Sequence, residues 1–131
     1  MARILVVDDE PSFRTFAALV LEIAGHQTTL AVDGLDALDA PGPFDLLLTD
    51  LMMPRMMGDE LARHMRQRDP TVKVLYLTGH PEELFKDERM LFAGEVVLKK
   101  PISPELLEDT VSLLLSACIA HTVAAAPSAE R

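Results

Sequence analysis

The sequence contains a single cysteine, a single tyrosine and no tryptophan among its 131 residues. Because Cys118 has no second cysteine to pair with, no disulfide can form within the chain, which favours a reducing compartment. No apolar run approaches the roughly 20 residues that a membrane-spanning helix needs, and no basic-then-apolar leader opens the chain. We therefore expect a soluble, cytoplasmic protein.

Basic residues are also scarce, with 12 Lys and Arg against 21 Asp and Glu, and the net charge is -9. A chain this acidic repels nucleic-acid backbones and anionic lipids, so we expect no direct binding to nucleic acid or membrane. The acidity suits binding of a cation, or solubility alone. Hydrophobic residues still make up 49% of the chain, which is enough for one domain to form its own core.

Short apolar runs alternate with segments of helical periodicity, a pattern typical of βα units around a parallel sheet. Strands are predicted over residues 3–7, 28–32, 44–49, 72–77 and 95–99. Helices are predicted over residues 11–24, 33–38, 58–67, 81–92 and 104–121. Because parallel crossovers are right-handed, these elements predict a doubly wound α/β fold with helices on both faces of the sheet. We expect one domain over residues 1–121, followed by a C-terminal tail over residues 122–131.

Helix boundaries are marked by residues with known terminal preferences. Pro11 suits the first turn of the first helix, and Gly25 suits a left-handed end to it. Asp33 and Ser103 stand where their side chains can cap the helices that follow.

Polar side chains follow four of the predicted strands at their carboxyl ends. Asp8 and Asp9 follow the first strand, Asp50 the third, Thr78 the fourth and Lys100 the fifth. In an open α/β sheet, ligands bind beyond the carboxyl ends of the strands, so these groups should meet at one rim. Each residue alone is an ordinary helix cap or surface charge. Their joint occurrence indicates a functional site.

The chemistry of these groups suits phosphoryl transfer. Clustered carboxylates repel one another, and a hard divalent cation such as Mg²⁺ relieves that repulsion and binds phosphate oxygens as well. A carboxylate in such a site can attack phosphorus and form an aspartyl phosphate. The hydroxyl of Thr78 and the ammonium of Lys100 would then stabilise the charge on the phosphoryl oxygens.

Four segments resemble motifs of bacterial two-component response-regulator receiver domains. They are residues 4–10 (ILVVDDE), 50–58 (DLMMPRMMG), 77–79 (LTG) and 99–102 (KKPI). The resemblance extends over residues 2–118. It implies a flavodoxin-like fold, a five-stranded parallel sheet in the order 2-1-3-4-5, as in the chemotaxis regulators.

The resemblance implies a role for each residue of the metal and acceptor site. Asp50 is the expected phospho-acceptor. Asp9 and Asp50 would bind Mg²⁺ directly and Asp8 mostly through water. The backbone carbonyl of Met52 would supply a further ligand.

The resemblance also implies how the site responds to phosphorylation. Thr78 would move towards a phosphoryl oxygen, and Lys100 would form an ion pair with the phosphate. The bond between Lys100 and Pro101 is expected to be cis. Val97 departs from the family, which often has Tyr or Phe at this position, so the aromatic half of the usual switch is not expected here.

The function implied is a signalling switch rather than an enzyme, apart from slow loss of its own phosphate. A histidine kinase or histidine phosphotransfer protein would donate the phosphoryl group. The face formed by residues 81–92, 95–99 and 104–121 would then change its binding to a downstream protein. A pseudo-receiver that binds partners without phosphorylation is the alternative. An Asp-nucleophile phosphatase is disfavoured because Asp8 and Asp9 are adjacent, and such enzymes place a second acid two residues after the nucleophile.

The last helix is more apolar than partial burial requires. The residues expected to face the sheet are Leu107, Val111, Leu114 and Cys118. The apolar residues left for its other faces are Leu106, Leu113, Leu115 and Ala117. These residues are either covered by the tail or form a surface for a partner or a second copy of the chain.

Overall fold

The computed structural model describes residues 1–79 and 95–116 of the protein. The strands of this part are β1 (Arg3–Val7), β2 (Gln27–Ala31), β3 (Leu46–Thr49), β4 (Lys73–Thr78) and β5 (Glu95–Lys99). Its helices are α1 (Pro11–Ile23), α2 (Gly34–Asp39), α3 (Gly58–Arg68) and α4 (Pro104–Ser116). The helix expected over residues 81–92, the last residues of the final helix and the tail expected over 122–131 lie outside the described residues.

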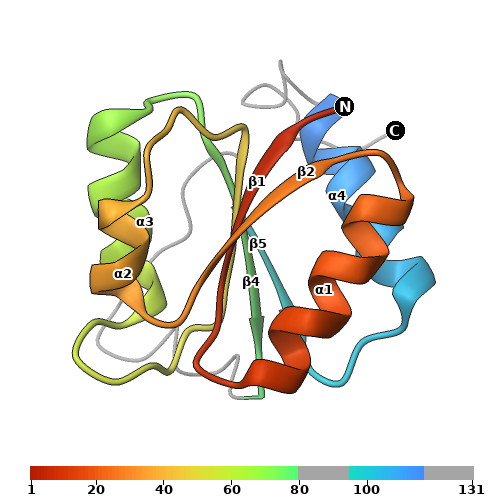
Figure 1. The fold of residues 1–131 in the computed structure, drawn as a ribbon, viewed down its shortest axis with the longest axis horizontal. Coiled ribbons are helices and arrows are strands. Elements are labelled where there is room, and N and C mark those ends of the chain that lie inside the picture. Colours follow the sequence, from red (N-terminus) through yellow and green to blue (C-terminus); the bar gives the residue numbers. More distant parts are fainter. Residues whose placement is uncertain (80–94, 117–131) are drawn as a thin grey trace.

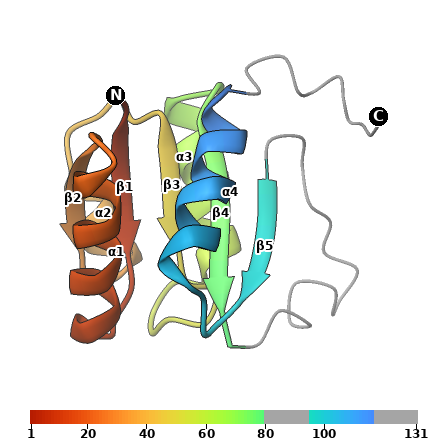
Figure 2. The same ribbon diagram turned by 90° about the vertical axis from the view of Figure 1, so that its right-hand side faces the viewer.

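The five strands form one parallel sheet in the order β2-β1-β3-β4-β5, which confirms the predicted order. Figure 2 shows the strands side by side in this order, with every arrow pointing the same way. The carboxyl ends of all five strands therefore lie along one edge of the sheet. Val7 at the end of β1 pairs with Thr49 at the end of β3, which aligns the residues that follow these strands.

Helices cover both faces of the sheet, as a doubly wound fold requires. α1 and α4 lie on one face, and α2 and α3 lie on the other (Figure 1). Because side chains alternate along a strand, Ile4 and Val6 of β1 pack towards α1 and α4, whereas Leu5 and Val7 pack towards α2 and α3. All four are fully buried, which explains why this strand reads as a continuous apolar run.

The four residues predicted to mark helix ends are confirmed by their local geometry. Pro11 is the first residue of α1, and Gly25 after its end has a positive φ of 97°. The side chain of Asp33 accepts a hydrogen bond from the backbone N–H of Asp36 and caps α2. Ser103 caps α4 through a 3.1 Å hydrogen bond from the N–H of Leu106 to its Oγ.

The third strand begins at Leu46 rather than at the predicted residue 44. The strand begins later because the backbone N–H of Arg3 donates its 2.8 Å hydrogen bond to the side-chain carboxylate of Asp45 and not to a backbone carbonyl of this strand. Phe44 is nevertheless buried in the core on the α2 and α3 face. The fourth strand continues to Thr78, one residue beyond the predicted end.

The final helix divides its apolar residues as predicted except at Leu115, which was expected on another face but is half-buried against the core on the α1 and α4 face. Ala117 and Cys118 lie outside the described residues. Leu107, Val111 and Leu114 are buried against the sheet. Leu106 and Leu113 are 47% and 69% exposed. Within residues 1–79 and 95–116, the structure contains no helix that is both long enough and apolar enough to cross a bilayer.

Candidate functional site

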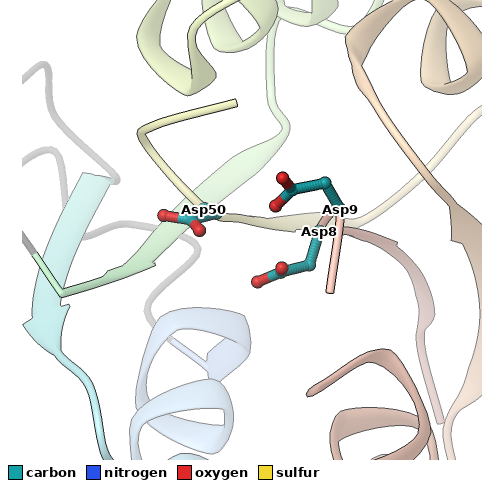
Figure 3. Close-up of side chains that lie close together, drawn as sticks. All are labelled: Asp8, Asp9 and Asp50. Carbon is teal, nitrogen blue, oxygen red and sulfur yellow. The ribbon is translucent and has the colours of Figure 1, made fainter. Parts of the chain in front are cut away.

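Three aspartates meet at the carboxyl edge of the sheet. Asp8 and Asp9 follow β1, Asp50 follows the neighbouring β3, and their ligand oxygens all lie within 4.8 Å of one another (Figure 3). The backbone N–H of Asp50 donates a 3.1 Å hydrogen bond to the carbonyl of Val7, so the register of the two strands positions the group. Asp8 is buried, Asp50 is half-buried and Asp9 is exposed. The site is therefore open to solvent on one side.

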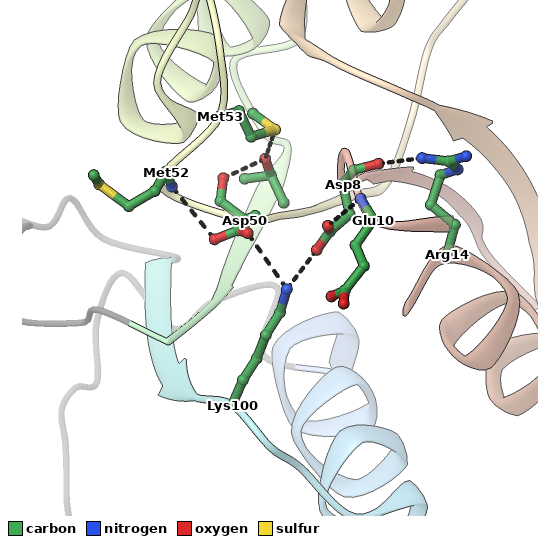
Figure 4. A network of polar contacts seen from close by, with 8 residues as sticks. Asp8, Glu10, Arg14, Asp50, Met52, Met53 and Lys100 are labelled. Atoms are coloured by element: carbon green, nitrogen blue, oxygen red, sulfur yellow. Dashed lines mark hydrogen bonds and ion pairs between the residues drawn. The ribbon is translucent and has the colours of Figure 1, made fainter. Parts of the chain in front are cut away.

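Lys100 reaches the aspartates from the far edge of the sheet, where it directly follows β5. Its Nζ lies 2.6 Å from Oδ2 of Asp8 and 3.3 Å from Oδ2 of Asp50, between the two carboxylates (Figure 4). The same Nζ lies 4.3 Å from the centroid of the Phe13 ring in α1. An aromatic face attracts a cation, so this ring helps to hold the ammonium in place.

The pKa values of Asp8 and Lys100 are both raised, but for different reasons. Burial raises the pKa of Asp8 above its usual range, and the hydrogen bonds from Lys100 and from the N–H of Glu10 offset this only in part. Burial alone would lower the pKa of Lys100, but its hydrogen bond to Asp8 and the negative charge of Asp50 raise it overall. Lys100 is therefore protonated at neutral pH and supplies a permanent positive charge to the site.

The orientation of Asp8 is set by two further residues that the sequence did not reveal. Its Oδ1 accepts a 2.9 Å hydrogen bond from the backbone N–H of Glu10. Its backbone carbonyl accepts a 2.6 Å hydrogen bond from Nη1 of Arg14 in α1. A basic residue in the first turn of the following helix is a weak signal, because a solvated arginine there looks the same in sequence.

The surroundings of Asp50 tie it to the loop that follows. Its Oδ1 accepts a 3.3 Å hydrogen bond from the backbone N–H of Met52, and its carbonyl accepts one from the Thr49 hydroxyl at 2.8 Å. Gly58 opens α3 directly against this carbonyl, since a Cβ at that position would lie 2.1 Å from the carbonyl oxygen. The loop can close over Asp50 only because position 58 has no side chain.

Thr78 ends β4 at the same rim and is fully buried. Its backbone carbonyl accepts a 2.8 Å hydrogen bond from the N–H of Lys100, which links it to the lysine through the main chain. The Lys100–Pro101 peptide bond is cis, as the resemblance implied. Val97 of β5 pairs with Tyr76 of β4 and packs against the core on the α2 and α3 face.

The donor set of the rim fits Mg²⁺. Hard cations of this kind take carboxylate and carbonyl oxygens, and Mg²⁺ leaves several positions for water or phosphate oxygens. Asp8, Asp9 and Asp50 supply the carboxylates, and one of them is already neutralised by Lys100. A divalent cation would balance the remaining negative charge.

Comparison with known proteins identifies the family. The model of the response regulator receiver domain matches residues 4–112, and the chain belongs to this family of two-component signalling proteins. The chain is similar to the response regulator receiver protein CpdR of Brucella abortus (strain 2308), with 34% identity over 120 residues that cover 89% of this chain and 100% of CpdR. It is also similar to the sensor histidine kinase TmoS of Ectopseudomonas mendocina, with 35% identity over 122 residues, which are 90% of this chain and 12% of TmoS.

Solved structures show the same fold. The chemotaxis protein CheY4 of Vibrio cholerae superposes with a TM-score of 0.76 and 31% identity over 88% of this chain and 99% of CheY4. The response regulator TrrA of Thermotoga maritima, solved in complex with Mg²⁺ and BeF, has a TM-score of 0.73 and 30% identity over 88% of this chain and all of its own. Receiver domains are signalling switches that bind Mg²⁺ in an acidic pocket, and the three aspartates here form a cluster that could hold a metal ion.

Proposed function

We propose that this protein is a phospho-acceptor switch that receives a phosphoryl group on Asp50, with Mg²⁺, from a histidine kinase or a histidine phosphotransfer protein. The observation that carries the proposal is the convergence of Asp8, Asp9, Asp50 and Lys100, which come from three strands, on one partly open rim. Helix caps or solvated surface charges have no reason to converge in this way.

In the transfer, a carboxylate oxygen of Asp50 forms the new bond to phosphorus while the bond between phosphorus and the donor nitrogen breaks. The donor histidine leaves with the electron pair of that bond. Asp9, Asp50 and the backbone carbonyl of Met52 would hold Mg²⁺ directly, and Asp8 would hold it mostly through water. When bound, the cation neutralises the phosphoryl oxygens during transfer.

Lys100 has a second partner available once the phosphoryl group is attached. In the present structure its ammonium bridges the carboxylates of Asp8 and Asp50. After transfer, one of those carboxylates is an acyl phosphate, and the ammonium would pair with a phosphoryl oxygen. The hydroxyl of Thr78 would bind another. Their movement would bias a two-state equilibrium of the β5 and α4 face, and so its binding to a downstream protein.

Val97 would make this switch different from that of receiver domains with Tyr or Phe at the same position. A valine has no ring to rotate inward behind Thr78, so the change in the β5 surface would depend on Thr78 and Lys100. The second candidate function is that of a pseudo-receiver, which binds partners without being phosphorylated. The observation in its favour is the valine at position 97.

The test is incubation with Mg²⁺ and acetyl phosphate, followed by measurement of the intact mass. We expect one phosphate that is labile to acid and base, absent without Mg²⁺ and absent from Asp50→Asn. A control variant, Asp39→Asn, removes an exposed carboxylate of α2 and should label like the wild type. Absence of label under conditions that phosphorylate other receivers would favour the binding module instead.

A further inference from the structure

The loop between β3 and α3 touches the start of α2 at two adjacent points. We call residues 51–57 the acceptor loop, because it follows Asp50. Arg55 in this loop forms an ion pair with Asp33, the cap residue of α2, and Met56 packs against Gly34, the first residue of that helix. Two consecutive residues of the loop therefore contact two consecutive residues of the α2 end.

The carboxylate of Asp33 is committed to this contact. Its side chain is 6% exposed, although the side chain of Arg55 is 65% exposed. One oxygen of Asp33 accepts the N–H of Asp36 at 2.8 Å, and the other accepts Nη2 of Arg55. The N–H of Asp36, together with Arg55, lowers the pKa of Asp33, so the carboxylate is ionised at neutral pH. A buried carboxylate with both oxygens occupied holds its partner in one position.

The backbone of Arg55 also needs support. Among residues 1–79 and 95–116, it is the one residue other than glycine with a positive φ, 71°. This conformation is disfavoured for a residue with a Cβ atom and persists where surrounding contacts impose it. The neighbouring contact is close as well, because a Cβ on Gly34 would lie 2.7 Å from Sδ of Met56. Arg55 and Met56 thus form a clamp between the loop and α2.

Met52, whose backbone carbonyl is proposed to bind the cation, belongs to the loop that the clamp holds. The acceptor loop is closed at its base by a 2.8 Å hydrogen bond from the N–H of Gly58 to the carbonyl of Leu51. Its far end is held on α2 by Arg55 and Met56. Met52 lies between the two attachments, and its N–H is bonded to Asp50. Movement of the far end would therefore displace Met52.

We propose that Arg55 is a positioning residue whose ion pair with Asp33 fixes the acceptor loop, and with it the Met52 carbonyl, and so sets the affinity for Mg²⁺. The inference rests on the proposed function, since it assigns Met52 to the cation site. Arg55 itself does not touch the cation or the phosphoryl group. Its effect passes through the backbone of the loop.

Simple electrostatics makes a different prediction from the clamp. Arg55→Gln removes a positive charge and Asp33→Asn removes a negative one, so long-range charge effects would tighten Mg²⁺ binding in the first variant and weaken it in the second. The clamp predicts weaker binding in both, because either change breaks the same ion pair. The asparagine keeps an oxygen that can still cap α2.

The experiment measures the dissociation constant of Mg²⁺ for the full chain by calorimetry, and of Mn²⁺ by paramagnetic resonance of the free ion. We expect Arg55→Gln and Asp33→Asn each to weaken binding by about two- to fivefold, the range for a partly exposed ion pair. The double variant should bind no more weakly than either single one, and Arg55→Lys should recover most of the loss. Arg63→Gln, which removes an exposed arginine of α3, is the matched control and should bind like the wild type.

Urea unfolding without metal completes the test. Lower stability with unchanged Mg²⁺ affinity in both variants would show a purely structural ion pair and overturn the inference. Opposite changes in affinity would also overturn it, in favour of long-range charge. Failure of the wild type to bind Mg²⁺ more tightly than Asp50→Asn would instead contradict the proposed function. The two failures are therefore distinguishable.

Discussion

The ammonium of Lys100 lies 2.6 Å from the carboxylate of Asp8, although 92 residues separate them in the chain. Lys100 follows the edge strand β5 and Asp8 follows β1, with β3 and β4 between them in the sheet. The lysine side chain therefore extends across the carboxyl edge to reach the aspartates. Its positive charge lies between the carboxylates of Asp8 and Asp50.

Replacement of this lysine should separate metal binding from phosphorylation. In Lys100→Met, the repulsion among Asp8, Asp9 and Asp50 is no longer offset, so we expect Mg²⁺ to bind on the order of tenfold more tightly. Phosphorylation by acetyl phosphate should nevertheless fall, because the phosphoryl oxygens lose their counter-charge. Calorimetry and intact mass measure the two effects. Lys99→Met removes the exposed neighbouring charge, and an equal effect there would contradict the role of Lys100.

Asp8 should lower the stability of the metal-free protein at neutral pH. Burial raises its pKa above the ordinary 3.8, so the folded state holds this proton more tightly than the unfolded state, and its contribution to stability declines as pH rises through the folded pKa. Asp8→Asn should therefore be more stable than the wild type at neutral pH, and the difference should vanish below about pH 3.8. Urea unfolding across this range checks the prediction. A constant difference at every pH would refute it.

Gly58→Ala should destabilise the protein by about 3 kcal/mol, the upper end of the range for overpacking, because its new Cβ would meet the backbone carbonyl of Asp50 at 2.1 Å. A backbone atom cannot move aside as a flexible side chain can. Gly79→Ala is the control, since a Cβ there would have nothing within 4 Å among residues 1–79 and 95–116. Thermal or urea unfolding of both variants gives the comparison, and similar losses in the two would contradict this account.

Tyr76 should resist ionisation as long as the protein is folded. Burial raises its pKa well above the ordinary 10.0, and the charge of Glu95 adds to the effect through a 3.4 Å hydrogen bond from the tyrosine hydroxyl. Because an unfolded tyrosine ionises near pH 10.0, the stability contributed by this residue is lost as pH rises above that value. As the chain has one tyrosine, tyrosinate absorbance reports on it alone. Tyrosinate formation near pH 10.0 while the protein stays folded would contradict the buried position of Tyr76. As pH rises, Tyr76→Phe should lose less stability than the wild type.

The exposed leucines of α4 provide a test of self-association. Leu113 is 69% exposed and Leu106 is 47% exposed. The sequence left two alternatives for these residues, cover by the tail or a surface for a partner or a second copy. If it forms a homodimer, Leu113→Glu should convert the dimer to a monomer in light-scattering measurements, because a charge cannot be buried there unpaired. Ser112→Glu, one residue earlier and also exposed, should leave the mass unchanged. A wild type that is monomeric, with and without phosphorylation, would exclude the homodimer.

The sequence predicted the sheet and its rim because both depend on local patterns. Buried parallel strands are continuous apolar runs, and the polar residues after them must lie at one edge whatever the details of packing. The contacts around Asp8 depend on tertiary structure instead. The helical spacing of Phe13 is that of a core residue, and it does pack against the core on the α1 face, but its ring also lies against Lys100, which no spacing indicates.

The clamp on the acceptor loop was beyond sequence reasoning for a similar reason. An arginine is a poor candidate for a left-handed conformation, so no local pattern marks Arg55. Asp33 was predicted as a helix cap, which it is, and that role accounts for only one of its two oxygens. The contact of Asp33 with Asp36 can be predicted because the two residues are close in sequence, whereas no sequence pattern indicates the contact with the distant Arg55.

The long separation between Asp8 and Lys100 also orders events during synthesis. The three aspartates leave the ribosome first, and the lysine that pairs with Asp8 and Asp50 emerges about 50 residues after Asp50. Domains generally fold as units once their chain is available, and until then the partly made chain carries an acidic cluster without its internal counter-ion. Completion of the edge strand β5 is thus the step that supplies the acidic cluster with its internal counter-ion.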